Sequence, residues 1–269
     1  MPESPASVSD QVRAACAWVA GRARSVTVDE SAIEAYAGDL PAGIDPPEPD
    51  PATELVEGGA ELRAAFVICL NAINFGSGWW PTIHKRPGHS GYFTIAAGVT
   101  ERFREKGAWS VAELTGMEPA AIAEVVGQEP GHPLMTDFAA SSYDGREAPF
   151  CKRPQLVPAD LDRAGVATLR DQDRLTAFAD NLVPHVLRVD GVLRLDPALA
   201  EAIDAGELLE HGSAEEVELR ACAIHAVELL AAAVKHRLLP AEVDYVLWTR
   251  GGARRYKAIP RPRSRNTAY

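Results

Sequence analysis

Leu175-Thr-Ala-Phe-Ala-Asp-Asn-Leu-Val-Pro-His-Val-Leu-Arg-Val-Asp-Gly-Val-Leu193 is the most informative stretch of this 269-residue chain. Its apolar residues recur at helical spacing, and Pro184 falls inside that pattern. A proline in a helix interior removes one N–H donor and crowds the carbonyl four residues earlier, here that of Asp180. The stretch therefore predicts a helix that bends or opens beside an acidic side chain.

The chain then turns at Gly191 and predicts a second helix from Asp196-Pro197, an N-cap residue followed by proline at the first helical position. The result is a helix, a tight hairpin and another helix. Proline kinks also occur in ordinary helical packing, so this segment alone does not define a function.

Helical spacing and capping residues predict helices along most of the chain. The strongest signals are the capping box Ser213-Ala-Glu-Glu216 and the helix restart at Pro240. Helices are predicted over residues 8–24, 29–37, 60–73, 97–106, 111–115, 118–126, 213–239 and 240–248, with another beginning within 150–158. Short strands are expected over 90–95, and loops over 38–52 and 132–148. The fold class is therefore mostly α: a single α-helical domain over residues 1–269 with a small β element and a flexible N-terminus over 1–8.

The composition is that of an ordinary globular protein, with 46% hydrophobic and 24% charged residues. We expect a cytoplasmic protein, because no apolar run approaches the length of a membrane span and the N-terminus lacks the features of a signal peptide. The cysteines are far apart, without a CxxC pair, so reduced thiols are expected and a zinc site is not. No nucleotide-cofactor, P-loop or histidine metal motif occurs, and we assign no cofactor and no metal.

A net charge of −11 argues against stable nucleic-acid binding, which needs a positive surface. The C-terminal tail is the exception, because residues 249–269 hold seven cations and no acid. This basic tail is either solvated or folds back to neutralise a phosphate on a small ligand. The cations are Arg250, Arg254, Arg255, Lys257, Arg261, Arg263 and Arg265.

Asp244 is the acid that helix geometry singles out, because it shares a face with Leu247 and Trp248. A carboxylate on an apolar face is desolvated, which strengthens its effect on a nearby reacting carbon. The alternative is an aspartate favoured in a first helical turn by the helix dipole.

Phe178 and Asp180 form a second candidate pair, since an aromatic ring and a carboxylate can hold a heterocyclic base by stacking and by accepting its N–H groups. Alternatively, the ring is core and the acid caps locally. Lys152 and Arg153 could contact a phosphate or ribose, or form a surface pair. Glu218, Arg220 and Glu228 are better explained by structural ion pairing.

Several ordered motifs resemble the queuosine salvage family. The stretch 175–187 resembles the family pattern LT-x-FADYR-x-PQ-x-L. Three further segments follow in the same order: 212–222 with 226–229 for G-x-x-x-EVEIRGCS and VEL, 243–248 for LDYYLWD, and the tail from Ile259-Pro260 through Arg263 and Arg265 to Tyr269. Weaker matches lie at 73–80, 90–93 and 150–155, so the similarity covers roughly residues 60–269.

The resemblance implies an N-glycosidase that releases queuine from queuosine 5′-phosphate, without metal or cofactor, on a fold akin to helix-hairpin-helix DNA glycosylases. It implies that Asp244 is the catalytic carboxylate, acting electrostatically or as a nucleophile, and that Phe178 and Asp180 hold the base. The remaining implied substrate contacts are Tyr36, Lys152, Tyr245, Thr249, Arg263 and Arg265.

This chain departs from the family pattern at several positions, which bear on the base rather than on the reaction type. Thr249 replaces an acid, Ala221 a glycine, His225 an aromatic residue, and Asn181-Leu182 a Tyr-Arg pair. Two alternatives follow: a helix-hairpin-helix DNA repair glycosylase, which the acidic charge opposes, and a queuine- or nucleotide-binding protein without catalysis.

Overall fold

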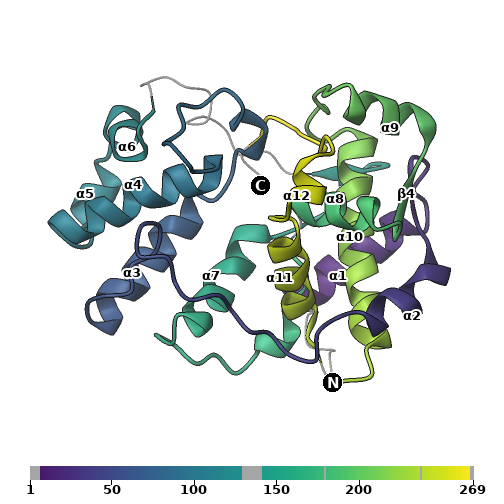
Figure 1. Ribbon diagram of the computed structural model, residues 1–269, viewed down its shortest axis with the longest axis horizontal. Coiled ribbons are helices and arrows are strands. Elements are labelled where there is room, and N and C mark those ends of the chain that lie inside the picture. Colours follow the sequence, from purple (N-terminus) through teal and green to yellow (C-terminus); the bar gives the residue numbers. More distant parts are fainter. Residues whose placement is uncertain (1–6, 129–140, 179, 237, 267–269) are drawn as a thin grey trace.

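Helices make up most of the structure, a computed structural model that describes residues 7–128, 141–178, 180–236 and 238–266 (Figure 1). The mostly α-helical prediction is confirmed. In chain order the elements are α1 (Val8–Ala20), β1 (Val26–Val28), α2 (Glu30–Gly38), α3 (Ala60–Ala72), the 3-10 helix η1 (Ser77–Trp79), α4 (Gly91–Lys106), α5 (Val111–Thr115), α6 (Pro119–Val126), β2 (Ser142–Tyr143), β3 (Arg146–Glu147), α7 (Lys152–Arg163), η3 (Gln172–Arg174), α8 (Leu182–Val189), β4 (Leu193–Leu195), α9 (Pro197–Asp204), α10 (Ala214–Ala233), α11 (Pro240–Arg250) and α12 (Arg254–Lys257).

Helix α10 is the centre of the larger half of the molecule, on the right of Figure 1. Helices α1, α2, α8 and α11 pack around it together with β1. Val217, Ile224 and Leu230 on α10 are fully buried, and the charged side chains of Glu216 and Glu218 are buried as well, because neighbouring elements surround this helix. Strands β1 and β4 form a small antiparallel pair in which Thr27 lies opposite Arg194.

Helices α3, α4 and α6 form a smaller half, on the left of Figure 1, with a core of its own. Phe66 on α3 and Phe103 on α4 meet edge to face, with ring centroids 5.5 Å apart. Helices α4 and α6 approach closely at Gly98, where a Cβ atom would lie 2.1 Å from the carbonyl oxygen of Val125. Only glycine fits this contact.

Helix α7 joins the two halves. Its residue Leu161 packs against the core of the smaller half, whereas Ala159 packs with Leu175, Phe178 and Ala241. This shared helix fits the prediction of a single domain over residues 1–269, which stays a prediction.

The predicted proline kink is wrong. Leu175–Phe178 are not helical, and α8 begins only at Leu182. Pro184 is therefore the third residue of α8, within the first turn, where backbone N–H groups have no partner in the helix. The ring causes no bend at this position, and the segment before α8 is free to approach α11.

The predicted strand over 90–95 is also wrong. Ser90 is the N-cap of α4, and its hydroxyl accepts a hydrogen bond from the N–H of Phe93 at 3.4 Å. The alternation of polar and apolar residues is only a few residues long here, and burial of Thr94 and Ile95 on one helix face decides the outcome.

The other predicted helices are confirmed with shifted ends: α1 ends at Ala20 and α10 at Ala233, before the predicted ends at residues 24 and 239. The loop over 38–52 is confirmed as well. The predicted flexible N-terminus over 1–8 and the loop over 132–148 fall partly outside the described residues, at 1–6 and 132–140.

None of the described helices is both long and apolar enough to cross a membrane. The four cysteines, Cys16, Cys69, Cys151 and Cys222, form no disulfide. Within the described ranges, no group of three or more histidine, cysteine or acidic side chains is arranged to hold a metal ion.

Candidate active site

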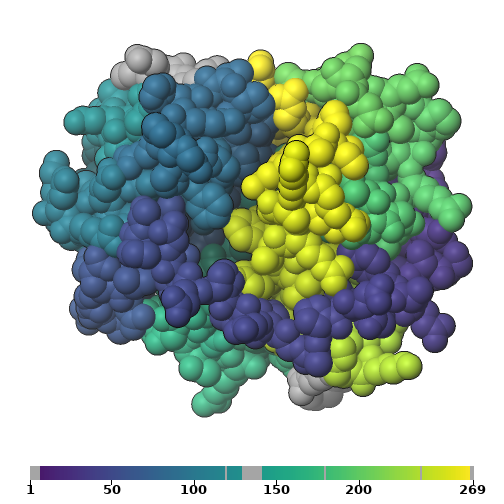
Figure 2. Space-filling view, viewed as in Figure 1, coloured from purple at the N-terminus to yellow at the C-terminus, as the bar shows by residue number. Residues whose placement is uncertain are grey.

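Asp244 lies on α11 at the boundary between the two halves, and it is only 4% exposed. Val243 and Leu247, on the same helix, are anchored in the larger core, while Ala241 packs with the α7 cluster. Figure 2 shows a recess along this boundary, between the blue surface of the α4 region and the yellow surface of α11. The sequence prediction of a desolvated carboxylate is confirmed.

The Asp244 carboxylate is held by the backbone of the segment before α8. Its Oδ1 accepts a hydrogen bond from the N–H of Phe178 at 2.9 Å. Burial raises the pKa of Asp244 well above its ordinary value, and the nearby charge of Asp180 raises it further. The Phe178 N–H and the Lys152 ammonium act in the opposite direction but do not cancel the effect of burial.

Asp180 is placed by its role as a cap. Its Oδ1 accepts hydrogen bonds from the N–H groups of Leu182 at 2.8 Å and Val183 at 3.0 Å, so it satisfies two donors at the start of α8. The other carboxylate oxygen has no hydrogen-bond donor among the described residues. The capping alternative is thus confirmed, and one oxygen is still available to a ligand.

Lys152 is the first residue of α7, and it is buried rather than on the surface. Its Nζ donates to the carbonyl oxygen of Asn74 at 3.3 Å. Burial lowers the pKa of Lys152, while the charges of Asp180 and Asp244 oppose that shift. The surface-pair interpretation is therefore wrong for Lys152, whose ammonium shares the boundary region with both candidate acids.

Aromatic rings from both halves line this region. Tyr245 stacks on Trp248 with ring centroids 6.5 Å apart, and Tyr92 of α4 meets Trp248 edge-on at 6.3 Å. The guanidinium of Arg163 lies 4.2 Å from the centre of the Tyr245 ring. Trp248 and Phe93 are still 36% and 38% exposed. The sequence did not identify Tyr92 as a neighbour of Trp248, because a strand was predicted over 90–95 where the chain forms α4.

Tyr36 lies in a different network. Its hydroxyl donates to Asp190 at 2.6 Å and accepts from Arg250 at 3.1 Å. Arg250 is six residues beyond Asp244, about 9 Å further along α11. No contact in the described structure joins Tyr36 to Asp180 or Asp244.

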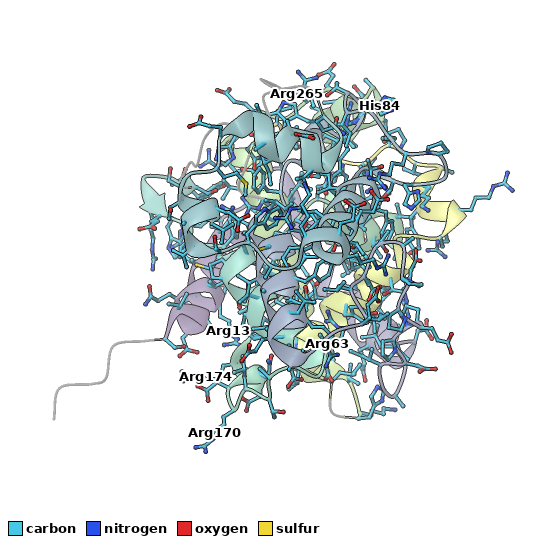
Figure 3. All side chains as sticks on the ribbon, turned by 90° about the vertical axis from the view of Figure 1, so that its left-hand side faces the viewer. Arg13, Arg63, His84, Arg170, Arg174 and Arg265 are labelled. Atoms are coloured by element: carbon cyan, nitrogen blue, oxygen red, sulfur yellow. The ribbon has the colours of Figure 1, made fainter. Side chains whose placement is uncertain are left out.

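The basic tail folds back onto the larger half. The side chain of Asn181 donates to the carbonyl oxygen of Pro262 at 3.1 Å. The N–H of Leu209 donates to the carbonyl oxygen of Arg263 at 2.8 Å. The Arg263 guanidinium is used structurally, because it donates to the carbonyl oxygen of Gly206 at 2.8 Å. Arg265 is exposed at the upper edge of Figure 3, and Thr249 is exposed on α11.

Arg261 is the tail residue that the sequence did not single out. It is partly buried, burial lowers the pKa of its guanidinium, and the charge of Asp180 opposes that shift. Arg261 therefore lies within electrostatic reach of Asp180. The composition of the tail could not distinguish it from six other cations.

The acids of α10 have structural partners. Glu228 pairs with Arg13 at 3.0 Å, and Arg220 pairs with Glu216 at 3.1 Å, so the ion-pairing interpretation is confirmed for these two residues. Glu218 instead accepts hydrogen bonds, from the N–H groups of residues 25 and 26 and from the Tyr143 hydroxyl at 2.6 Å.

A separate surface hollow of about 370 Å³ lies between the start of α1 and η3. Arg170 and Arg174 line this hollow, and Figure 3 shows both at the lower end of the molecule, far from Arg265. Arg174 is paired with Asp10 at 3.2 Å. The hollow contains none of the predicted site residues, so the Asp244 region is the better candidate.

Known proteins are similar to this chain over much of its length. The family model described as "Queuosine salvage protein" matches residues 132–269, which include α7, α8 and α11. A protein of Sphaerobacter thermophilus named queuosine 5′-phosphate N-glycosylase/hydrolase is 30% identical over 268 residues, covering 78% of this chain and 83% of that protein.

Proteins of the same name from two eukaryotes match a shorter region. The Dictyostelium discoideum protein is 34% identical over 134 residues, covering 47% of this chain and 42% of its own length. The Mus musculus protein is 32% identical over 149 residues, covering 48% and 43%. The family model and the long bacterial match together establish that the chain belongs to the queuosine salvage protein family.

Proposed function

We propose that this protein is a hydrolase that cleaves the N-glycosidic bond of queuosine 5′-phosphate and releases queuine for tRNA modification. The observation that carries the proposal is the Asp244 carboxylate, buried beside Asp180 and Lys152 in an aromatic-lined recess. The names of the relatives support the same activity over a DNA repair glycosylase or a non-catalytic binding protein.

The reaction breaks the bond between C1′ of the ribose and the glycosidic nitrogen of the base. Positive charge develops on C1′ and the ring oxygen, as in glycoside hydrolysis generally. Asp244 stabilises this charge, either electrostatically or by bonding to C1′ in a glycosyl-enzyme intermediate. Water then bonds to C1′ through its oxygen, breaking the bond from C1′ to the Asp244 oxygen where one has formed. One proton of this water balances the proton that the departing base takes up.

A raised pKa suits Asp244 to this role. The free carboxylate is destabilised by burial and by Asp180, so a positive charge on C1′ relieves an unfavourable state. Because the interaction is strongest when the charge is greatest, it lowers the barrier more than it strengthens substrate binding. The Phe178 N–H keeps the carboxylate oriented without neutralising it.

Asp180 is proposed to orient the base through the carboxylate oxygen that does not cap α8. The ring of Phe178 is 4% exposed and belongs to the cluster of Ala159 and Ala241, so stacking on the base would use a face at the edge of that cluster. Tyr245, stacked on Trp248, supplies a further aromatic surface.

The other predicted substrate contacts differ in how well their surroundings support them. Lys152 is supported by its burial beside both acids. Tyr36, Thr249, Arg263 and Arg265 have no contact with the Asp244 region in the described structure. We propose a small-molecule nucleotide as the partner, with no stable nucleic-acid binding, and a cytoplasmic location.

Incubation of the protein with queuosine 5′-phosphate in excess chelator tests the proposal. Free queuine, detected by chromatography and mass spectrometry, is the expected product. The Asp244→Asn variant serves as the negative control, in which little queuine should be released. No release, or release only with added metal, would contradict it. A gel shift with damaged and intact DNA duplexes at low salt tests the rival function, which tight, salt-sensitive binding would favour.

A further inference from the structure

Asp190 is a buried carboxylate that fastens the chain leaving α11 onto the end of α8. It is the residue that follows α8, and its side chain is only 6% exposed. Two side chains of α12 bind it: the Tyr256 hydroxyl donates at 2.9 Å, and the Arg255 guanidinium forms an ion pair. The Tyr36 hydroxyl on α2 donates to it at 2.6 Å. A buried charge with three donors is well satisfied, and such networks stiffen the elements that they join.

Tyr36 connects this junction to α11 itself. Arg250, the last residue of α11, donates to the Tyr36 oxygen at 3.1 Å and to the carbonyl oxygen of Asp39 at 3.0 Å. A tyrosine hydroxyl carries one proton, so Tyr36 gives it to Asp190 and accepts from Arg250. Burial and the bond to Asp190 raise the pKa of Tyr36, which keeps that proton in place. The result is a continuous chain of hydrogen bonds from α11 through α2 to α8.

The chain at the start of α8 is fixed against the same helix at two places. The N–H of Phe178 binds Asp244, and a Cβ atom on Gly251, the residue that follows α11, would lie 2.7 Å from the Leu182 side chain. Asp244 and Gly251 are seven residues apart, or about 10 Å along the helix axis. Asp180 lies between Phe178 and Leu182 in the sequence. A shift of α11 along α8 would therefore change the separation of Asp180 and Asp244.

We propose that Asp190 and Tyr36 are positioning residues for the reaction: with Arg250 they hold α11 in place against α8 and thereby set the separation of the two candidate acids. The inference rests on the proposed function, and it adds residues that act through α11 without touching the substrate. It also gives Tyr36 a role that does not require contact with Asp180 or Asp244.

The pKa of Asp244 reports how α11 is placed. Asp180 faces Asp244 from the segment before α8, and Lys152 and Arg163 face it from α7. Burial and the charge of Asp180 are the two causes that raise the pKa of Asp244, and both depend on close packing of α11. Loosening α11 admits water and separates the acids, so the pKa of Asp244 should fall toward its ordinary value.

The experiment compares Tyr36→Phe with Tyr143→Phe in the whole chain. Both changes remove a hydroxyl that donates at 2.6 Å to a buried carboxylate. The Tyr143 hydroxyl, however, binds Glu218 on α10 and the Arg22 carbonyl, not a residue of α8 or α11. We expect similar losses of Tm in the two variants, because each loses one such bond.

Only Tyr36→Phe should lower kcat for queuosine 5′-phosphate, by about 10-fold, with KM changed by less than about threefold. Only Tyr36→Phe should also move the acidic limb of the kcat–pH profile to lower pH, because Asp244 has to lose its proton to act. Equal losses of kcat in the two variants, or wild-type kinetics in Tyr36→Phe, would overturn the proposal.

Arg250→Met completes a double-mutant cycle with Tyr36→Phe. The two residues are consecutive members of one chain of bonds, so the double variant should lose little more kcat than Tyr36→Phe alone. Asp190→Asn should lose at least as much, because an amide cannot accept from all three donors. Multiplicative losses from Tyr36→Phe and Arg250→Met, or wild-type kcat in Asp190→Asn, would overturn the proposed chain of contacts.

A measurement without substrate separates this inference from the catalytic proposal. The carboxyl carbon of Asp244, assigned by its absence from the spectrum of Asp244→Asn, gives the pKa by NMR titration. This pKa should be lower in Tyr36→Phe than in the wild type and in Tyr143→Phe. If the wild type hydrolyses no nucleotide yet shows this difference, the proposed function fails and the positioning role stands. If the wild type is active but Tyr36→Phe matches it in both pKa and kcat, the positioning role alone fails.

Discussion

The backbone N–H of Phe178 donates to Oδ1 of Asp244 at 2.9 Å, across 66 positions of sequence. This bond joins the two family motifs that the chain carries on separate elements, the segment before α8 and the first turns of α11. It sets the position of the candidate catalytic carboxylate relative to Asp180, the candidate base-binding residue two positions after Phe178. The two acids are therefore coupled in position as well as in charge.

Replacing Asp244 by Asn should reduce kcat by at least about 100-fold, because an amide cannot stabilise positive charge on C1′ as a carboxylate does. The amide oxygen can still accept from Phe178, so the backbone should stay in place. Nucleotide affinity, measured by calorimetry, should change little, because the lost interaction is strongest in the transition state. Near-normal turnover would show that the assignment is wrong, and Asp180 would be the next candidate.

The same variant should be more stable than the wild type at neutral pH. The pKa of Asp244 is raised in the folded protein above its ordinary value of 3.8, so the folded state binds a proton that the unfolded state has released. Stability of the wild type therefore falls as pH rises from about 3.8 through the raised pKa, whereas Asp244→Asn lacks this contribution. The free energies of unfolding of the two proteins should converge near pH 4 and diverge by pH 8. A difference that does not vary with pH would contradict this origin of the pKa shift.

Asp180→Asn should separate base binding from capping. Asparagine retains the oxygen that accepts from Leu182 and Val183, so stability should stay within about 0.5 kcal/mol of the wild type. Loss of the carboxylate charge should still raise KM and lower kcat. Asp180→Ala should lose about 1 kcal/mol of stability in addition.

The control for this experiment is the N-cap of α9, where Asp196 accepts from the N–H of Leu199 at 3.0 Å. Asp196→Ala should cost a similar amount of stability without changing KM. If Asp180→Asn has wild-type kinetics, Asp180 is a cap and nothing more.

Gly78→Ala should loosen the contact between the smaller half and the tail. The new Cβ atom would lie 2.1 Å from the Ser264 carbonyl oxygen, so the tail backbone has to move. Overpacking of this kind typically costs about 1–3 kcal/mol. We expect a lower Tm and weaker binding of the 5′-nucleotide. Gly43→Ala is the control, because a Cβ atom there meets nothing within 4 Å. Wild-type nucleotide affinity in Gly78→Ala would show that this contact does not shape the site.

Local signals in the sequence were sufficient for most helix starts. Asp29, Asp196 and Ser213 cap their helices through bonds between a side chain and a backbone N–H two or three residues away, and Pro240 begins α11. Such bonds depend on neighbouring residues only, so the sequence contains all the information that they need. The desolvation of Asp244 was predictable for a similar reason, since helical periodicity alone places it on an apolar face.

The failures have a common cause, which is that packing between distant segments decided the outcome. Burial of Thr94 and Ile95 in the smaller half made a helix where a short alternation suggested a strand. The stretch around Pro184 looked like one interrupted helix, yet the chain before Leu182 leaves helical geometry and its Phe178 N–H binds Asp244 instead.

The sequence by itself determined the helical class and most helix starts, and it singled out Asp180 and Asp244 as the candidate acids. Only the tertiary structure decided which cation of the basic tail lies beside Asp180. Arg261, Arg263 and Arg265 are equivalent in composition, but the bond from Asn181 to the Pro262 carbonyl and the contact of Ser264 with Gly78 set the path of the tail. That path places Arg261 within electrostatic reach of Asp180, directs the Arg263 guanidinium to the Gly206 carbonyl and leaves Arg265 exposed. Contacts across more than eighty residues of chain fix it, and no local pattern encodes them.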